Sequence, residues 1–140
     1  MSDVRFIRQV VVFDAADIAA ESAFWGAMLG GRVIDEDERF HVVIDSGGEW
    51  RIGVQLAPDH TKPDWPDGEP QQVHLDLHVE NGPAAHARAL ELGAVLLYEG
   101  DASAPHDHNV YADPAGHPFC IGWGQATHDQ LAAFLAKLDE

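Results

Sequence analysis

Several residue types are scarce in this chain of 140 residues, and each scarcity excludes a class of protein. Cys120 is the single cysteine, so no internal disulfide can form and the core alone must hold the fold. No apolar run approaches the ~20 residues that span a bilayer, since the run from Val10 to Phe13 ends at Asp14. That run also lacks the cleavage site of a signal peptide, so we expect a cytoplasmic protein with no membrane partner.

Basic residues are also scarce. The 8 lysines and arginines stand against 24 aspartates and glutamates, which gives a formal net charge of −16. Such a charge repels phosphate backbones and anionic lipid headgroups, so neither nucleic acid nor a membrane surface is an expected partner. The length suits a single domain, 1–140, that buries a core without a structural metal.

The first half of the chain has the periodicity of one strand, one helix and three strands. A strand over 4–13 precedes a helix that Asp17 caps and that ends at Gly30-Gly31. Three short strands are predicted after it, with Ser46-Gly47-Gly48 as the turn before the last one. Their predicted ranges are about 32–36, 39–45 and 50–56.

The second half repeats this order after a linker. Four prolines within 58–70 exclude regular structure there. The predicted elements beyond the linker are a strand at 72–79, a helix from about Pro83 to Leu92, strands near 94–98, 109–113 and 118–123, and an amphipathic helix at about 128–138.

The two halves also agree in detail. Asp17 lies seven residues after Val10, and Asn81 lies seven residues after His74. The predicted helix of each half ends in a Leu-Gly pair, at Leu29 in the first half and at Leu92 in the second. The chain therefore reads as two equivalent modules, about 4–57 and 71–124, with one helix appended.

Three segments carry a resemblance to a known family: Phe24-Trp25-x-x-x-Leu29-Gly30, Val73-His74-Leu75-Asp76-Leu77 and Asp113-Pro114-x-Gly116-x-x-Phe119-Cys120. In their order and spacing they resemble the vicinal oxygen chelate superfamily of glyoxalase I, extradiol dioxygenases, fosfomycin-resistance enzymes and bleomycin-binding proteins. The glyoxalase-like domain branch is nearest, and the resemblance spans about 4–124. It implies an α+β fold in which two βαβββ modules form paired half-barrel sheets around a cleft, plus a C-terminal helix.

The resemblance also implies four metal-ligand positions, which in this chain are Val10, Gln55, His74 and Cys120. A valine cannot bind a metal, and Cys120 stands where metal-dependent members have a glutamate. Magnesium and manganese require several oxygen ligands, and this set offers only the Gln55 amide oxygen. We therefore expect no metal cofactor. If a divalent metal binds, ligand chemistry favours zinc or nickel on Gln55, His74 and Cys120.

Alternation along the strands extends the predicted cleft. Asp76 and His78 share the side of His74, Arg51 shares the side of Gln55, and the opposite sides of these strands are apolar. Trp65 in the linker is a candidate lid. The expected substrate-binding cleft is Val10, Arg51, Gln55, Trp65, His74, Asp76, His78 and Cys120, although a merely solvated sheet face would also be polar.

Two further features concern the ligand. Arg8 and Arg51 fall on inward sides, which favours a small organic anion or a polar aromatic metabolite, unless acidic neighbours pair with them. His106-x-His108 has metal-like spacing, but its Pro- and Asp-containing surroundings predict a solvated turn or a lip of the cleft.

Three functions follow from these observations. The first is a protein that binds a small organic molecule without a metal. The alternative is a metal-dependent lyase or isomerase of glyoxalase type, with His74 and Gln55 on the metal and Asp76 or His78 moving protons. The third function is that of a regulatory domain that interacts with other proteins. The sequence assigns no catalytic residue. We also expect a homodimer, because relatives with open half-barrel sheets pair to cover their edges.

Overall fold

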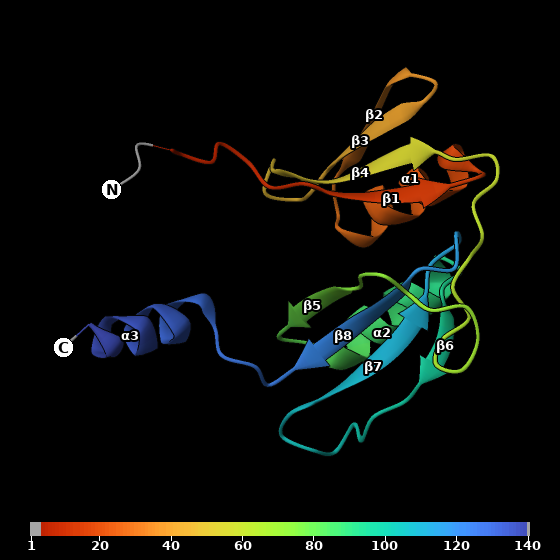
Figure 1. The fold of residues 1–140 in the computed structure, drawn as a ribbon. Coiled ribbons are helices and arrows are strands. Elements are labelled where there is room, and N and C mark those ends of the chain that lie inside the picture. Colours follow the sequence, from red (N-terminus) through yellow and green to blue (C-terminus); the bar gives the residue numbers. More distant parts are fainter. Residues whose placement is uncertain (1–3, 140) are drawn as a thin grey trace.

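The computed structural model describes residues 4–139, which form two sheets, each with a helix packed on one face (Figure 1). Module one contains β1 (Val11–Ala15), α1 (Ile18–Met28), β2 (Arg32–Asp37), β3 (Phe40–Ile44) and β4 (Trp50–Leu56). Module two contains β5 (Leu75–Val79), α2 (Gly82–Glu91), β6 (Val95–Tyr98), β7 (Asp107–Ala112) and β8 (Pro118–Trp123), and α3 (His128–Leu138) follows it.

The two sheets have the same topology. Their strand orders are β1-β4-β3-β2 and β5-β8-β7-β6, and the first strand of each module runs parallel to the last. The remaining neighbours are antiparallel. This arrangement confirms the predicted α+β fold of two βαβββ modules with a C-terminal helix.

The structure confirms the predicted cap at Asp17 and has an equivalent cap at Asn81. The Asp17 side chain accepts a hydrogen bond from the Ala20 amide at 3.0 Å, and the Asn81 side chain accepts one from Ala84 at 3.0 Å. Gly30 and Gly93, with φ of 69° and 98°, lie just beyond the two helices, where a left-handed conformation favours glycine.

Three predicted strand starts were wrong. β1 begins at Val11, opposite Ile52, rather than at residue 4, and in this parallel register the residues before 9 would lie beyond the start of β4 at Trp50. β5 begins at Leu75, opposite Phe119 of β8. β7 begins at Asp107, so His108 belongs to a strand and not to the predicted turn.

Aromatic side chains from both modules form one shared core. Trp25 of α1 and Phe119 of β8 are both completely buried, and their ring centroids lie 4.9 Å apart. Phe13 of β1 stacks on Trp25 at 5.5 Å, and Phe24 contacts Phe119 at 5.8 Å. Because α1 packs on the apolar side of β8, the polar face of the second sheet points away from this core.

A buried carboxyl pair crosses the same junction. Glu21 of α1 is completely buried, and the Ala115 amide donates to its Oε1 at 3.1 Å. Burial, followed by the neighbouring Asp113 carboxylate, raises the pKa of Glu21 to about 10. Glu21 is therefore protonated at neutral pH beside Asp113, whose own Oδ2 accepts from Trp25 Nε1 at 2.9 Å. Within the described chain, no helix is long and apolar enough to cross a bilayer.

The Glu21 proton predicts how stability depends on pH. The folded state keeps a proton that the unfolded chain loses above its ordinary pKa of 4.5, so stability falls as pH rises from 4.5 to about 10. The slope is at most about 1.4 kcal/mol per pH unit. Glu21→Gln keeps a donor for Asp113 but does not titrate, so its free energy of unfolding should depend less steeply on pH.

Urea unfolding at several pH values between 5 and 9 measures this difference. Glu91→Gln, at an exposed position on α2, is the matched control and should follow the wild-type curve. Wild type and Glu21→Gln curves that run parallel across this range would contradict the protonated pair.

Candidate functional site

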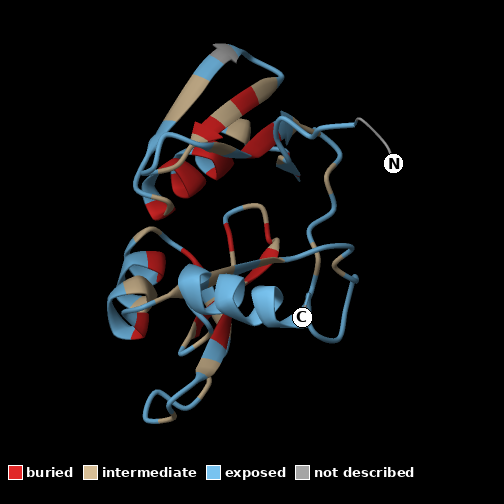
Figure 2. Cartoon of the chain, turned by 90° about the vertical axis from the view of Figure 1, so that its left-hand side faces the viewer, coloured by how far each residue is buried: buried red, intermediate tan, exposed pale blue. Residues whose placement is uncertain are grey.

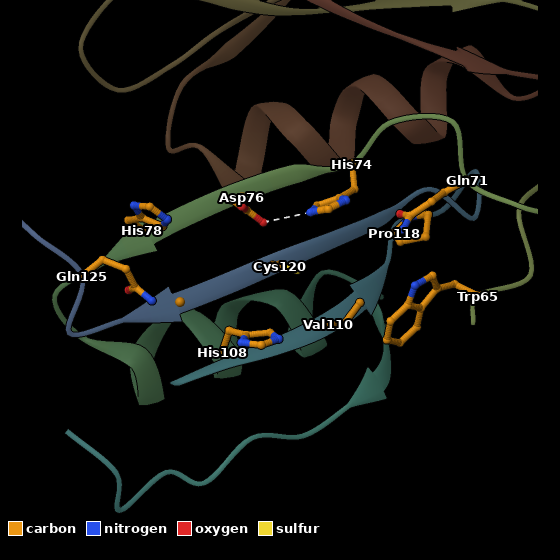
Figure 3. Close-up of a pocket in the computed structure, with 11 residues that line it drawn as sticks. Trp65, Gln71, His74, Asp76, His78, His108, Val110, Pro118, Cys120 and Gln125 are labelled. Carbon is orange, nitrogen blue, oxygen red and sulfur yellow. Dashed lines mark ion pairs between the residues drawn. The ribbon is translucent and has the colours of Figure 1, made fainter. Parts of the chain in front are cut away.

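A cleft of about 340 Å³ lies on the polar face of the second sheet (Figure 3). Strands β5, β7 and β8 form its floor, and the linker and the segment after β8 form its ends. Its lining residues are Trp65, Gln71, His74, Asp76, His78, His108, Val110, Pro118, Cys120, Gly122 and Gln125.

Strand register brings the side chains of the floor together. Asp76 of β5 pairs with Cys120 of β8, which pairs in turn with Val110 of β7. His78 and His108 both pair with Gly122, one from each side. The intervening residues of β8, Phe119 and Ile121, are completely buried in the core, as the alternation predicted.

The charged and titratable groups gather at β5 and β8. His74 Nε2 lies 3.2 Å from Asp76 Oδ1, and both side chains are about half exposed. Burial, and after it the Asp76 charge, raises the pKa of the Cys120 thiol to about 11. Cys120 is therefore a protonated thiol at neutral pH, which is a poor nucleophile.

Two glutamine amides at the ends of the cleft have unsatisfied oxygens. Gln71 Oε1 and Gln125 Oε1 are buried, and neither has a hydrogen-bond partner within the described residues. Glycine at 122 makes room for Gln125, because a Cβ there would lie 2.8 Å from its Nε2. Most buried polar atoms are paired, so each of these oxygens is a candidate acceptor for a ligand or a water.

Apolar walls complete the cleft at one end. Trp65 from the linker lies there with Pro118 and Val110, whereas His78 and Gln125 lie at the other end (Figure 3). Trp65 thus lines the cleft, and its role as a lid stays a prediction. The site offers an aromatic surface at one end and hydrogen-bonding groups along the rest.

Three of the expected cleft residues, Val10, Arg51 and Gln55, do not line this cavity. Gln55 Nε2 donates to Asp14 Oδ1 at 3.5 Å, and Arg51 Nε lies 3.4 Å from Asp45 Oδ2. All three belong to module one, and within the described chain Val10 and Gln55 do not line the cavity beside His74 and Cys120. Arg51 lines a different cavity, of about 650 Å³, together with Arg8 and Asp76.

For His108 the sequence left open a solvated turn or a lip of the cleft, and the structure places it in the lining of the cleft. His108 shares the period of two with Val110, so a predicted strand beginning two residues earlier would have decided between these alternatives. Gln71 and Gln125 were not expected in the cleft. They lie outside the strands, so the alternation of side chains along a strand could not predict where they point.

The metal positions implied by the family resemblance do not fit a hard cation. Val10 and Gln55 belong to module one and do not line the cleft, so the Gln55 amide oxygen is not beside His74 and Cys120. Asp76 takes their place, and one ligand atom from each of His74, Asp76 and Cys120 lies within 4.8 Å of the others. This nitrogen, oxygen and sulfur set suits zinc better than magnesium or manganese.

Comparisons with known proteins agree with the fold. Residues 10–122 match the profile of the glyoxalase-like domain. The comparison with curated protein sequences finds no match.

Among solved structures, a glyoxalase/bleomycin resistance/dioxygenase family enzyme of Burkholderia phytofirmans PsJN is similar, with a TM-score of 0.65 and 20% identity over 84% of this chain and 98% of its own. The fosfomycin resistance protein FosX of Mesorhizobium loti has a TM-score of 0.64 and 13% identity over 90% and 98%. A glyoxalase/dioxygenase of Nostoc punctiforme has a TM-score of 0.65 and 16% identity over 89% and 94%. At these identities the similarity concerns the fold alone.

Proposed function

Since the chain belongs to the glyoxalase-like domain family, we propose that it binds a small polar aromatic molecule in the cleft of module two, without magnesium or manganese. The observation that carries this proposal is the pair of buried, unpaired amide oxygens of Gln71 and Gln125. A ligand that donates hydrogen bonds to both would satisfy them, and leaving such groups unpaired costs about 1–3 kcal/mol each.

The charge of the cleft disfavours an anionic ligand. No lysine or arginine is among its described lining residues, and Asp76 contributes a carboxylate. The expectation of an anion relied on Arg8 and Arg51, but neither lines the cleft, and the Arg8 guanidinium lies 5.1 Å from the Trp50 ring. A neutral or cationic ligand with hydrogen-bond donors therefore fits this site.

The apolar end of the cleft supports an aromatic component. Trp65, Val110 and Pro118 form a wall against which a planar ring can pack. Sites for small ligands commonly combine such walls with a few polar groups that fix orientation. A ring at this end would leave the polar substituents of the ligand within the part of the cleft that Gln125 and His78 line.

Calorimetric titration of polar aromatic compounds tests the proposal. For a compound that binds wild type, Gln71→Leu and Gln125→Leu should each weaken binding about threefold to tenfold, because each removes one hydrogen bond. Trp65→Ala should weaken it further by removing the aromatic wall.

Gln72→Leu is the matched control, since Gln72 is exposed and does not line the cleft. It should leave the affinity unchanged. Equal affinities of wild type, Gln71→Leu and Gln125→Leu for every compound that binds would contradict the proposal.

One observation favours a second candidate, a metal-dependent lyase or isomerase. The ligand atoms of His74, Asp76 and Cys120 are close enough to bind one ion together. Asp76 would then supply the oxygen ligand that was expected from Gln55. Zinc held there would act as a Lewis acid on an oxygen of the substrate, and His78 lines the same cleft as a group able to carry protons.

Thermal unfolding of metal-free protein with added ions separates the two candidates. We expect no stabilisation by magnesium or manganese, because one carboxylate among the three ligands cannot replace their hydration shells. Magnesium- or manganese-dependent stabilisation that His74→Ala removes would contradict this expectation. Stabilisation by zinc that Cys120→Ser removes and Gln55→Ala leaves intact would establish the metal site on which the second candidate depends.

A homodimer is also proposed, and the exposed side of α3 supports it. No residue of α3 is buried, and its apolar residues form one stripe, with Leu131 47%, Phe134 58%, Leu135 49% and Leu138 66% exposed. Figure 1 shows α3 apart from both sheets, and Figure 2 shows it exposed along its length. An isolated helix of 11 residues is marginal in water, so a second copy is the proposed cover for this stripe.

Light scattering measures this association. The wild-type mass should be twice 15.3 kDa, and Leu135→Asp should shift it toward the monomer by placing a charge within the stripe. Ala133→Asp, on the opposite side of α3, is the control and should leave the dimer intact. A monomeric wild type at micromolar concentration would contradict the proposal.

A further inference from the structure

A second cavity, of about 290 Å³, lies on the other side of the second sheet. It is bounded by the start of α2, the loop after β6 and the end of β8. Its described lining residues are Glu80, Gly82, Pro83, His86, Glu99, Gly100, Ala102, Asn109 and Trp123.

Strand alternation separates this cavity from the cleft. His108 and Val110 of β7 line the cleft, whereas Asn109, between them in sequence, lines the second cavity. Gly122 and Trp123 of β8 divide in the same way. The sheet itself therefore stands between two sites that share no lining residue.

A hydrogen-bond network beside the cavity determines which ring nitrogen of His86 carries the proton. The Gly100 amide donates to Asn109 Oδ1 at 2.8 Å, which turns Asn109 Nδ2 toward the Tyr111 hydroxyl at 3.0 Å. Asn109 Nδ2 also lies 3.5 Å from His86 Nδ1, and because an amide nitrogen only donates, His86 Nδ1 is an acceptor and takes the Tyr111 proton at 2.8 Å. Burial raises the pKa of Tyr111, which keeps that proton in place. His86 then carries its proton on Nε2, a donor available to a ligand.

Local contacts hold the walls in position. Gly82 allows α2 to approach Trp123, because a Cβ at this position would lie 3.2 Å from the indole ring. The Trp123 Nε1 donates to the Ala104 carbonyl at 3.2 Å, and Asp101 accepts from the Ser103 amide at 2.9 Å. The loop after β6 is thus tied both to β8 and to itself, and the cavity is formed without a ligand.

The charges around the cavity favour a cation. Glu80 and Glu99 are exposed carboxylates in its lining, and none of its described lining residues is lysine or arginine. An anion would find little attraction at the start of α2, because Asn81 already accepts the Ala84 and Ala85 amides. Trp123, Pro83 and Ala102 supply an apolar surface.

We propose that this second cavity binds a small organic cation: an ammonium group between Glu80 and Glu99, an aromatic or apolar body against Trp123, and a hydrogen-bond acceptor for His86 Nε2. Its volume is at the lower end of the range for small-molecule sites, which selects a compound with one ring. This site is independent of the function proposed for the cleft.

Three probes of similar size test the proposal, and binding is measured by the changes that each causes in the amide chemical shifts of the protein. The titrations are done at ~0.15 M salt, because a Debye length of about 8 Å then screens the net charge of the chain. Tyramine carries the ammonium, the ring and the acceptor; phenethylamine lacks the acceptor; 3-(4-hydroxyphenyl)propanoate replaces the ammonium by a carboxylate. Tyramine should give saturable shifts at Gly82, Gly100 and Asn109, phenethylamine should bind more weakly, and the propanoate should give none.

Charge variants locate the cation. Glu80→Gln with Glu99→Gln should weaken tyramine binding at least fivefold, whereas Glu91→Gln, an exposed carboxylate of α2 outside the cavity, should change it less than twofold. The proposal fails if tyramine gives no saturable shift, if the propanoate binds equally well, if Glu91→Gln has the same effect, or if the shifts fall at His74 and Cys120 instead.

Discussion

The contact between Trp25 and Phe119 joins the two modules, and both sites on the second sheet depend on it. The indole of Trp25 packs on the apolar side of β8 and donates to Asp113, which lies beside the buried Glu21. This contact directs one side of the second sheet toward the core of module one. The opposite side is left free, and the cleft forms there.

Because side chains alternate between the two faces of a strand, neighbouring residues of the second sheet lie in different environments. Phe119 and Ile121 fill the core, while Cys120 and Gly122 between them line the cleft. On β7, neighbouring residues 108 and 109 serve two cavities that do not communicate through the sheet. One strand register thus positions the core, the cleft and the second cavity, so a slip of a single residue would disturb all three.

The family fold does not by itself decide the chemistry of the cleft. One scaffold can host unrelated activities. Of the four positions that the family resemblance implies, Val10 offers no metal ligand, and Gln55 of β4 does not line the cleft with His74. What remains in the cleft is a set of hydrogen-bonding groups with one aromatic wall, together with a His, Asp and Cys cluster suited to a softer ion.

The sequence determined what depends on neighbouring residues: the caps at Asp17 and Asn81, the helix ends, the order of strands, and the shared face of His74, Asp76 and His78. These features are local, because backbone periodicity and hydrogen bonds within a few residues produce them. Only the tertiary structure placed Gln55 apart from His74, brought Gln71 and Gln125 to the cleft, and buried Glu21 beside Asp113, 92 positions away in sequence. Those outcomes depend on how one module packs against the other, which no short-range pattern encodes.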